Sequence, residues 1–452
     1  MRHPARLPCR FLATLLGVVL LAGCASYSQS FRRVELRLLG NDPAGALAIL
    51  DQQEHGSKDR FLYACNRGML LRMLGRFEES NREFETAKAI LEQYAATSIS
   101  EQAASFVIND ASRTYLGSPV EQVMLHIYSA LNYLALNDRD GARVEILQAD
   151  LRLRRLMQDD PDSPLSVDPF ARYLSGIVYE DLGEWSDAMI AYRKAYEAYQ
   201  AHAQLYDIRL PRQLQRALIR SAARMGLDDE RRRYEQAFGQ HLDELPPAGD
   251  GGELVVFFHA GLAPIKRESS IDVLEPRSGH MIRVALPRYE PRPYPASQLR
   301  LRLQPALFAD GPVPAREARS EKTEDIAQLE IKTLESQIGA ITARAIARAA
   351  AKHELARETG RQNDLAGLIV NIAGVLSERA DTRSWLTLPA EIQTARLPAP
   401  AGRYRLELAL LDAGGNILLQ RDLGEIELAK GRKHYLSFNQ ASLLPVINPR
   451  PR

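Results

Sequence analysis

One stretch constrains the fold of this chain more than any other: residues 172–199, in which two helical patterns meet at a Leu-Gly turn. Counted from Gly183, an aromatic residue stands at +2, alanine at +5, an aromatic at +9 and alanine at +12. Residues 61–94 repeat this order around Gly75, with serine at the first small position. The matching residues are Trp185, Ala188, Tyr192 and Ala195 in one stretch and Phe77, Ser80, Phe84 and Ala87 in the other. Such a repeat predicts pairs of antiparallel helices that pack through small residues.

Further copies of this pattern are weaker. Residues 122–150 keep the small and large packing positions, residues 31–52 give a degenerate first pair, and residues 211–241 give a polar pair suited to capping an array. The spacing resembles that of tetratricopeptide (TPR) repeats. One helix pair cannot bury its apolar face alone, so neighbouring pairs stack and present a surface that binds other molecules. We therefore expect a TPR-like α-solenoid over residues 31–241.

The helical period stops at residues 242–252, where proline and glycine crowd together in LDELPPAGDGG. Alternating apolar residues then predict strands. The predicted strands are Glu253–Phe258, Met281–Leu286, Leu299–Leu303, Trp385–Leu388, Glu391–Leu397, Gly402–Asp412, Ile417–Leu423 and Lys433–Phe438. A long helix, or two, is predicted over residues 323–358. We expect residues 242–252 to be a linker and residues 253–445 to form an α+β domain with an antiparallel sheet and two or three helices.

The most apolar helical pattern of this second half is Asp364–Leu376. It is interrupted by Asn371 and is too short to span a bilayer. We expect a core helix under the sheet, and a partner-binding helix is the alternative.

The first residues have the pattern of a targeting segment. Three arginines precede the apolar run Phe11–Leu21, and Leu-Ala-Gly-Cys follows, ending at Cys24. This lipobox resembles those of bacterial lipoproteins, so we expect residues 1–23 to be a signal peptide, Cys24 to be lipidated and residues 24–30 to be a tether. Ala25, not aspartate, comes next, which in Gram-negative lipoproteins implies the outer membrane, on the periplasmic side. An ordinary signal peptide with a chance cysteine is the alternative.

Charge and cysteine content narrow the function classes. The formal net charge is +1, and loss of the three arginines in residues 1–23 makes it −2, which argues against nucleic-acid binding and polybasic membrane attachment. With Cys9 cleaved off and Cys24 acylated, Cys65 is the remaining thiol, so we expect no intramolecular disulfide. Its place in a helical pattern predicts a small buried hydrophobic side chain.

Catalytic motifs are not recognised in the sequence. G-x-S-x-G, H-E-x-x-H, a P-loop and S-x-x-K do not occur, and the nine histidines do not pair at metal-ligand spacing. We therefore expect no enzyme, no cofactor and no metal site. The best catalytic candidate is His259, which follows the predicted strand Glu253–Phe258 and precedes a loop. A hydrogen-bonded or solvated histidine is the alternative.

Aromatic and arginine side chains are the candidates for binding a partner. Three tyrosines of residues 173–199 stand away from the strongest packing positions, and we expect some of them to line a groove for an extended or helical peptide. They are Tyr173, Tyr196 and Tyr199. Arg383 and Trp385 are residue types of interface hot spots. The alternative is that Arg383 pairs with Asp381 while Trp385 enters the core.

Three stretches of the second half carry a family resemblance: Gly252–Glu268, Val284–Pro293 and Ala380–Leu408. With the lipobox and the repeats, they resemble a family of proteobacterial TPR outer-membrane lipoproteins to which no activity is assigned. The resemblance carries over no catalytic residues. We expect a non-enzymatic scaffold or adaptor that binds periplasmic or outer-membrane proteins, in envelope or peptidoglycan assembly. The alternative is an envelope enzyme, or a glycan- or small-ligand-binding module in residues 253–445.

Overall fold

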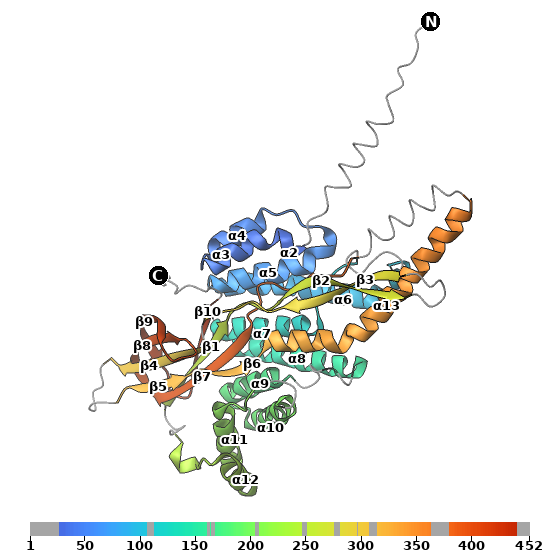
Figure 1. Ribbon diagram of the computed structural model, residues 1–452. Coiled ribbons are helices and arrows are strands. Elements are labelled where there is room, and N and C mark those ends of the chain that lie inside the picture. The colour runs from blue at the N-terminus through green and yellow to red at the C-terminus, as the bar shows by residue number, and fades with distance from the viewer. Residues whose placement is uncertain are drawn as a thin grey trace.

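The computed structural model describes most of the chain between residues 27 and 440. The described ranges are 27–105, 113–160, 163, 168–203, 208–245, 251–274, 281–295, 297–306, 314–362 and 379–440, without the side chains of 95–105, 282, 349 and 352–362. The predicted signal peptide, Cys24 and the predicted helix Asp364–Leu376 lie outside these residues. Helices fill the first half and strands most of the second, so the mixed α and β content agrees with the expected class (Figure 1).

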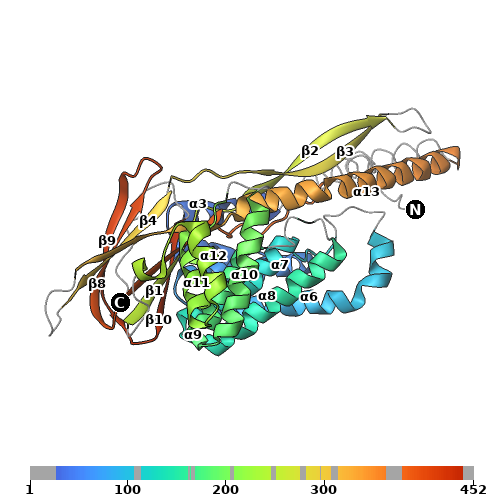
Figure 2. The same ribbon diagram turned by 90° about the horizontal axis from the view of Figure 1, so that it is seen from below.

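The helices of the first half follow one another in pairs. They are α2 (Tyr27–Ser30), α3 (Arg32–Leu39), α4 (Pro43–Asp51), α5 (Arg60–Met73), α6 (Phe77–Ser105), α7 (Pro119–Ala135), α8 (Arg139–Asp159), α9 (Pro169–Leu182), α10 (Trp185–His202), α11 (Arg212–Arg224) and α12 (Asp228–Phe238), with short 3-10 turns at Ser57–Asp59 and Leu242–Glu244. From α3 onward each helix packs most closely on its partner in the pair, and neighbouring pairs also touch, so the pairs form a continuous array (Figure 2). Part of the predicted tether is thus already helical, as α2.

The turn inside each pair has the same backbone geometry. Each contains one residue with a positive φ, the left-handed conformation that ends the first helix and that glycine adopts without strain. These residues are Asn41 (56°), Gly75 (75°), Asn137 (58°), Gly183 (78°) and Gly226 (68°). The weak sequence copies therefore have the same turn as the strong ones.

Small residues bring the helices of a pair together, as the spacing predicts. Gly68 faces the Phe84 ring and Gly176 faces the Tyr192 ring, and a Cβ atom at either glycine would overlap that ring. The two positions are equivalent in the repeat, so the offsets in the sequence correspond to real helix–helix contacts. Cys65 is a free, fully buried thiol of this array, which confirms the expected packing role.

The second half contains three sheets within the described residues. Its strands are β1 (Gly251–Ala260), β2 (Ile265–Leu274), β3 (Met281–Glu290), β4 (Gln298–Pro305), β5 (Arg316–Arg319), β6 (Glu321–Glu324), β7 (Glu391–Pro400), β8 (Gly402–Leu411), β9 (Ile417–Leu428) and β10 (Lys433–Gln440). The orders are β10-β1-β7-β6 and β5-β4-β8-β9, with β2 and β3 as a separate hairpin. The central sheet is mixed, because β10 pairs in parallel with β1 while β7 pairs antiparallel with it. The expected antiparallel sheet is present as β5-β4-β8-β9, and the parallel pair of β10 with β1 is an addition to that expectation.

Several predicted elements differ in detail. Residues 385–388 are not a strand but an irregular segment, because their backbone bonds to helix side chains and not to a neighbouring strand. The strands β2, β5 and β6 were not expected, since β2 is mostly polar and the other two have four residues each. The predicted long helix is α13 (Ile326–Gln362), which lies along the β2–β3 hairpin and projects with it from the body (Figures 1 and 2).

Candidate functional site

The repeat helices and the central sheet share one hydrophobic core. The largest cluster of buried side chains includes Phe61, Tyr128 and Phe170 from α5, α7 and α9, and also Phe257 from β1. The rings of Phe170 and Phe257 meet edge to face, with centroids 6.3 Å apart. The side of the array formed by these helices is therefore occupied by strands of the same chain. The junction between the two halves is the candidate functional site, because most charged and aromatic side chains singled out in the sequence gather there.

At one end of this junction, Trp385 inserts between helices. The side chain is 1% exposed, and its ring packs against Phe84 of α6 and Tyr128 of α7 at centroid distances of 5.8 and 6.1 Å. Edge-to-face packing of this kind adds to the stabilisation that comes from burying large rings. Trp385 therefore anchors the segment that precedes β7 to the repeat array.

Hydrogen bonds hold the same segment. The backbone N–H of Trp385 donates to Glu121 Oε1 at 2.6 Å, and the Thr387 hydroxyl donates to Asn66 Oδ1 at 2.9 Å. Burial raises the pKa of Glu121 to about 7, and the negative charge of Glu330 contributes to that rise. The contacts at this end are thus made by rings, neutral donors and a carboxyl group that titrates near neutral pH.

Arg383 joins the same segment to residues next to α5 and α7 through hydrogen bonds. Its Nε and Nη2 donate to the Asp381 carboxylate at 2.9 and 2.8 Å. Its Nη1 donates to Asp59 Oδ1 at 3.1 Å and to the Arg113 carbonyl at 2.9 Å. The guanidinium lies over the Tyr115 ring, 5.1 Å from the centroid. Because the side chain is satisfied inside the molecule, it is not available to a separate protein.

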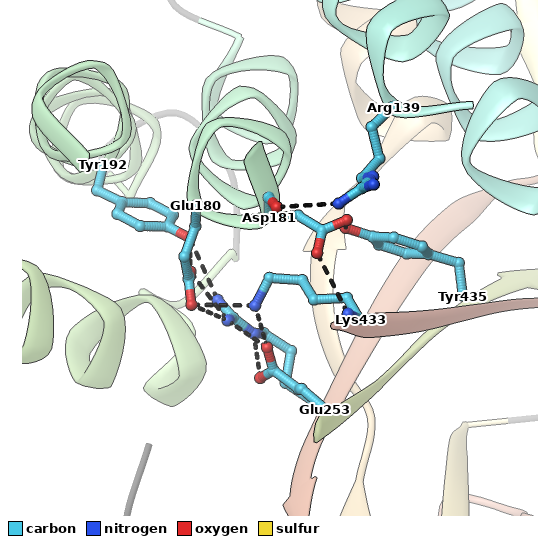
Figure 3. Close-up of polar contacts among 8 residues, drawn as sticks. Arg139, Glu180, Asp181, Tyr192, Glu253, Lys433 and Tyr435 are labelled. Carbon is cyan, nitrogen blue, oxygen red and sulfur yellow. Dashed lines mark hydrogen bonds and ion pairs between the residues drawn. The ribbon is translucent and has the colours of Figure 1, made fainter. Parts of the chain in front are cut away.

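At the other end of the junction, four charged side chains form a buried cluster, surrounded by the contacts drawn in Figure 3. They are Glu180 of α9, Glu253 of β1, Arg396 of β7 and Lys433 of β10. Arg396 Nη2 donates to Glu253 Oε2 at 2.7 Å and to Glu180 Oε2 at 3.0 Å. Lys433 Nζ donates to Glu180 Oε1 at 3.0 Å and also contacts Glu253. One helix and three strands are thereby joined through two cations and two carboxylates.

The balance of charge keeps this cluster ionised. Burial alone would raise the pKa of Glu253, but Arg396 and Lys433 outweigh burial and hold that pKa well below its usual range. Glu180 has a lowered pKa in the same way: burial opposes the shift and the two cations prevail. Burial would lower the pKa of Arg396, and the two carboxylates raise it well above its ordinary value instead. Glu180, Glu253 and Arg396 are therefore ionised at neutral pH.

Neighbouring polar groups extend this cluster (Figure 3). Asp181 accepts hydrogen bonds from the Lys433 backbone N–H and from the Tyr435 hydroxyl, both at 3.2 Å. Arg139 Nη1 donates to the Asp181 carbonyl at 3.4 Å, and the Tyr192 hydroxyl donates to Glu180. Asp181 thus joins α9 to β10 directly, while the bonds of Arg139 and Tyr192 join α8 and α10 to α9.

A cavity of about 560 Å³ opens beside the ionic cluster, between α8, α9, α11, the start of β1, β7 and the turn before β10. Six basic and three acidic side chains line it. The basic ones are Arg139, Arg220, Arg224, Arg396, Arg432 and Lys433, and the acidic ones are Glu180, Asp181 and Glu253. A cavity of this size matches small-molecule sites, and its lining has an excess of positive charge.

His259 does not lie in an open loop. It belongs to β1, is 1% exposed, and its Nδ1 is 3.1 Å from the Tyr128 hydroxyl. Burial lowers the pKa of His259 well below its usual range, and the charge of Arg72 lowers it further, so the ring is neutral. Among the described residues no carboxylate hydrogen-bonds to the ring. Because substrate does not reach a buried ring, the role of His259 as a catalytic loop residue is corrected to that of a core histidine.

The predicted peptide groove is also corrected. Tyr173 and Tyr199 are 0% and 1% exposed, and the Tyr199 hydroxyl donates to the Thr323 carbonyl of β6 at 2.7 Å. Tyr196 is half-buried and packs edge to face on Tyr234 and Phe238 of α12. The tyrosines fill contacts inside the array or toward the sheet, so they do not line a groove for another molecule.

For Arg383 and Trp385 the structure agrees with the alternative interpretation. Arg383 pairs with Asp381, and Trp385 lies in the core. The prediction that they form a hot spot for a separate partner is therefore wrong, because both side chains make contacts between the two halves of this chain. The residue types were those of an interface, and the interface is internal.

The residues that sequence reasoning missed are those of the ionic cluster. Glu253 directly precedes the apolar run of β1, and Arg396 lies between Ala395 and Leu397 of β7, where a buried charge needs a partner. That isolation is the one signal that sequence offered. Their partners, Glu180 and Lys433, lie 216 and 180 positions away from Arg396 and Glu253 respectively, so spacing gave no indication of the pairing.

No group of three or more histidine, cysteine, aspartate or glutamate side chains in the described part of the chain is arranged to hold a metal ion. Over the same residues, every helix is too short or too polar to cross a lipid bilayer.

No protein-family model and no curated protein matches this chain. Among solved structures, MamA from AMB-1 is similar with a TM-score of 0.30 and 14% identity, over 48% of this chain and 92% of MamA. MamA from MSR-1 is similar with a TM-score of 0.28 and 15% identity, over 47% of this chain and 95% of MamA. Scores of this size do not define a shared fold. The helix-pair arrangement therefore rests on the turns and contacts of this chain itself.

Proposed function

We propose that this chain is a non-enzymatic scaffold lipoprotein of the outer membrane, facing the periplasm, whose helical repeats bind a protein partner. The lipobox ending at Cys24 supports the location, and the stacked helix pairs support the binding role. One side of the array is filled by the chain's own strands, so the partner surface is the opposite side. The observation that carries this assignment is an apolar stripe that α8 turns to solvent.

The stripe consists of Val144, Leu147 and Leu151, which are 55%, 47% and 43% exposed. Their spacing of three and four residues places them on one face of α8. Ion pairs flank them: Arg143 with Glu184 at 3.1 Å and Arg154 with Asp150 at 2.6 Å. Single exposed apolar residues are ordinary, but an apolar centre with a charged rim has the anatomy of a protein interface. The partner is expected to offer an apolar helix or strand face with polar edges.

Capture from cell envelopes tests the docking surface. A crosslinkable Leu147→Asp variant is compared with the unchanged chain and with Ile417→Asp, an exposed apolar residue of β9 that is 50% exposed. We expect proteins enriched by the unchanged chain to be lost with Leu147→Asp and kept with Ile417→Asp. Both variants should unfold within about 0.5 kcal/mol of the unchanged chain, because the sites are on the surface. If both variants capture the same proteins as the unchanged chain, α8 is not the docking surface.

Fractionation tests the location separately. Replacement of the acylated residue, Cys24→Ser, should release the protein from the membrane fraction, since the anchor depends on buried acyl chains. The proposal predicts outer-membrane fractionation of the unchanged chain and soluble periplasmic protein for the variant. Outer-membrane fractionation of the variant would overturn the lipid anchor without affecting the docking proposal.

A further inference from the structure

The lining of the junction cavity has three more basic than acidic side chains. Arg396 and Lys433 are balanced by Glu180 and Glu253 in the ionic cluster. The third carboxylate, Asp181, accepts its hydrogen bonds from a backbone N–H and a tyrosine hydroxyl. The other basic residues of the lining are Arg139, which donates to the Asp181 carbonyl, Arg224, which stacks on Trp185, and Arg220 and Arg432.

We propose that this cavity binds a small molecule that carries two or more negative charges on carboxylate or phosphate oxygens. Arginine is suited to such groups, because its planar fork donates two parallel hydrogen bonds to one oxyanion. The cavity, at about 560 Å³, has the size of a small-molecule site. Binding here goes beyond protein docking on α8, and uses different residues.

Two arginines of α11 form the centre of the site. Arg220 and Arg224 are one helical turn apart, so both reach the cavity from the same face. The Arg224 guanidinium lies over the Trp185 ring, 4.2 Å from the centroid. Stacking fixes the plane of the guanidinium and leaves its N–H groups to donate through their edges. Trp185, which lines the same cavity, therefore positions one arginine of the site.

The position of Arg220 gives an electrostatic reason for an anion. This side chain is half-buried, and burial lowers its pKa; the nearby positive charge of Arg396 lowers it further, while the carboxylates of Glu253 and Glu180 offset only part of the shift. A bound oxyanion beside Arg220 would offset both effects, because an opposite charge favours the ionised guanidinium. The same cavity walls come from the repeat helices and from the strands, so a bound anion would also join the two halves.

Calorimetry with defined anions tests the site. The chain without residues 1–23 is titrated with pyrophosphate and, separately, with citrate, at two NaCl concentrations. We expect at least one anion to bind with a Kd below about 1 mM, a range typical of modest small-molecule sites. The double variant Arg220→Gln and Arg224→Gln should weaken binding at least tenfold. Preference for pyrophosphate or citrate then identifies the ligand group as phosphate or carboxylate.

A matched control removes the same charge elsewhere. The double variant Arg82→Gln and Arg232→Gln replaces two arginines whose side chains are 71% and 62% exposed and do not line the cavity. It should bind as the unchanged chain does. If this control loses as much affinity as the cavity variant, the effect is general charge and the site is overturned. The site is also overturned if the unchanged chain binds neither anion.

Two further measurements keep the test decisive if the double variant folds poorly. Arg224→Lys keeps the charge but loses the planar fork, so it should fold and still weaken binding. Trp185 fluorescence should change on anion binding in the unchanged chain, because the ring lies under Arg224. Trp385 should contribute no change, because it is buried against Phe84 and Tyr128. Unchanged affinity in Arg224→Lys together with no fluorescence change would overturn the assignment. Leu147→Asp should bind anions normally, which separates this site from partner docking.

Discussion

The two ends of the junction hold the same two halves together by different physics. At the Trp385 end, aromatic rings are removed from water, which stabilises roughly in proportion to apolar area, and the cation Arg383 is paired there with Asp381 and Asp59. At the Arg396 end, two cations and two carboxylates replace their hydration by one another, which gives little net stabilisation but makes any unmatched change costly. Burial therefore supplies the stability of the junction and charge matching supplies its specificity. The cavity of about 560 Å³ lies at the ionic end.

The largest effect is expected at the apolar end. Trp385→Ala should lower the free energy of unfolding by about 5 kcal/mol, because the removed ring leaves a cavity against Phe84 and Tyr128. Urea unfolding followed by circular dichroism measures the loss. Trp385→Phe, which keeps part of the ring contact, should lose much less. A loss under about 1 kcal/mol in Trp385→Ala would show that the helices do not depend on this segment.

A somewhat smaller and pH-dependent effect is expected at the ionic end. Arg396→Ala should cost about 3 kcal/mol at pH 7, because Glu180 and Glu253 would remain buried with one cation fewer. In the unchanged chain both carboxyls have lowered pKa values, so their contribution is present above the unfolded pKa of about 4.3 and is lost as pH falls below it. The cost of the substitution should therefore shrink at acid pH, where the carboxyls of the variant become protonated.

Urea unfolding at pH 7 and near pH 4 distinguishes this from a packing defect. Arg405→Ala is the control, since its ion pair with Asp422 involves a side chain that is 59% exposed. That variant should leave the free energy of unfolding close to that of the unchanged chain at either pH, because exposed ion pairs contribute little. If Arg396→Ala lowers the free energy of unfolding equally at both pH values, the Arg396 end is held by packing and not by charge.

The smallest effect concerns the histidine between the two ends. His259 has a lowered pKa, so it stays neutral in the fold while the unfolded chain takes up a proton below about pH 6.5. Its contribution to stability is present above that pH and is lost as pH falls, by up to about 1.4 kcal/mol per pH unit. His259→Asn, which keeps an acceptor for Tyr128, should flatten the pH dependence between pH 7 and 5. An unchanged slope in His259→Asn would contradict the prediction.

The helix pairs are the part of this protein that its sequence determined. The contacts of a pair lie within one turn and two helices, as Gly176 on Tyr192 does, so fixed offsets along the chain translate directly into packing. The left-handed turn at Gly183 is likewise a local property, because glycine adopts that backbone without strain. The helices and their stacked pairs could be predicted from such spacing, and so could the burial of Cys65.

The junction was decided only by the tertiary structure. Trp385 meets Glu121 across 264 positions and Arg396 meets Glu180 across 216, and no spacing rule links residues so far apart. The parallel pairing of β10 with β1 has the same origin, since it depends on the path of the whole second half. A side chain that is suited to binding a partner in the sequence, such as Trp385, becomes an internal contact once the chain folds back on its own helices. Local sequence preference determines which helix, turn or strand a residue forms. The long-range path of the chain determines which distant side chain it contacts.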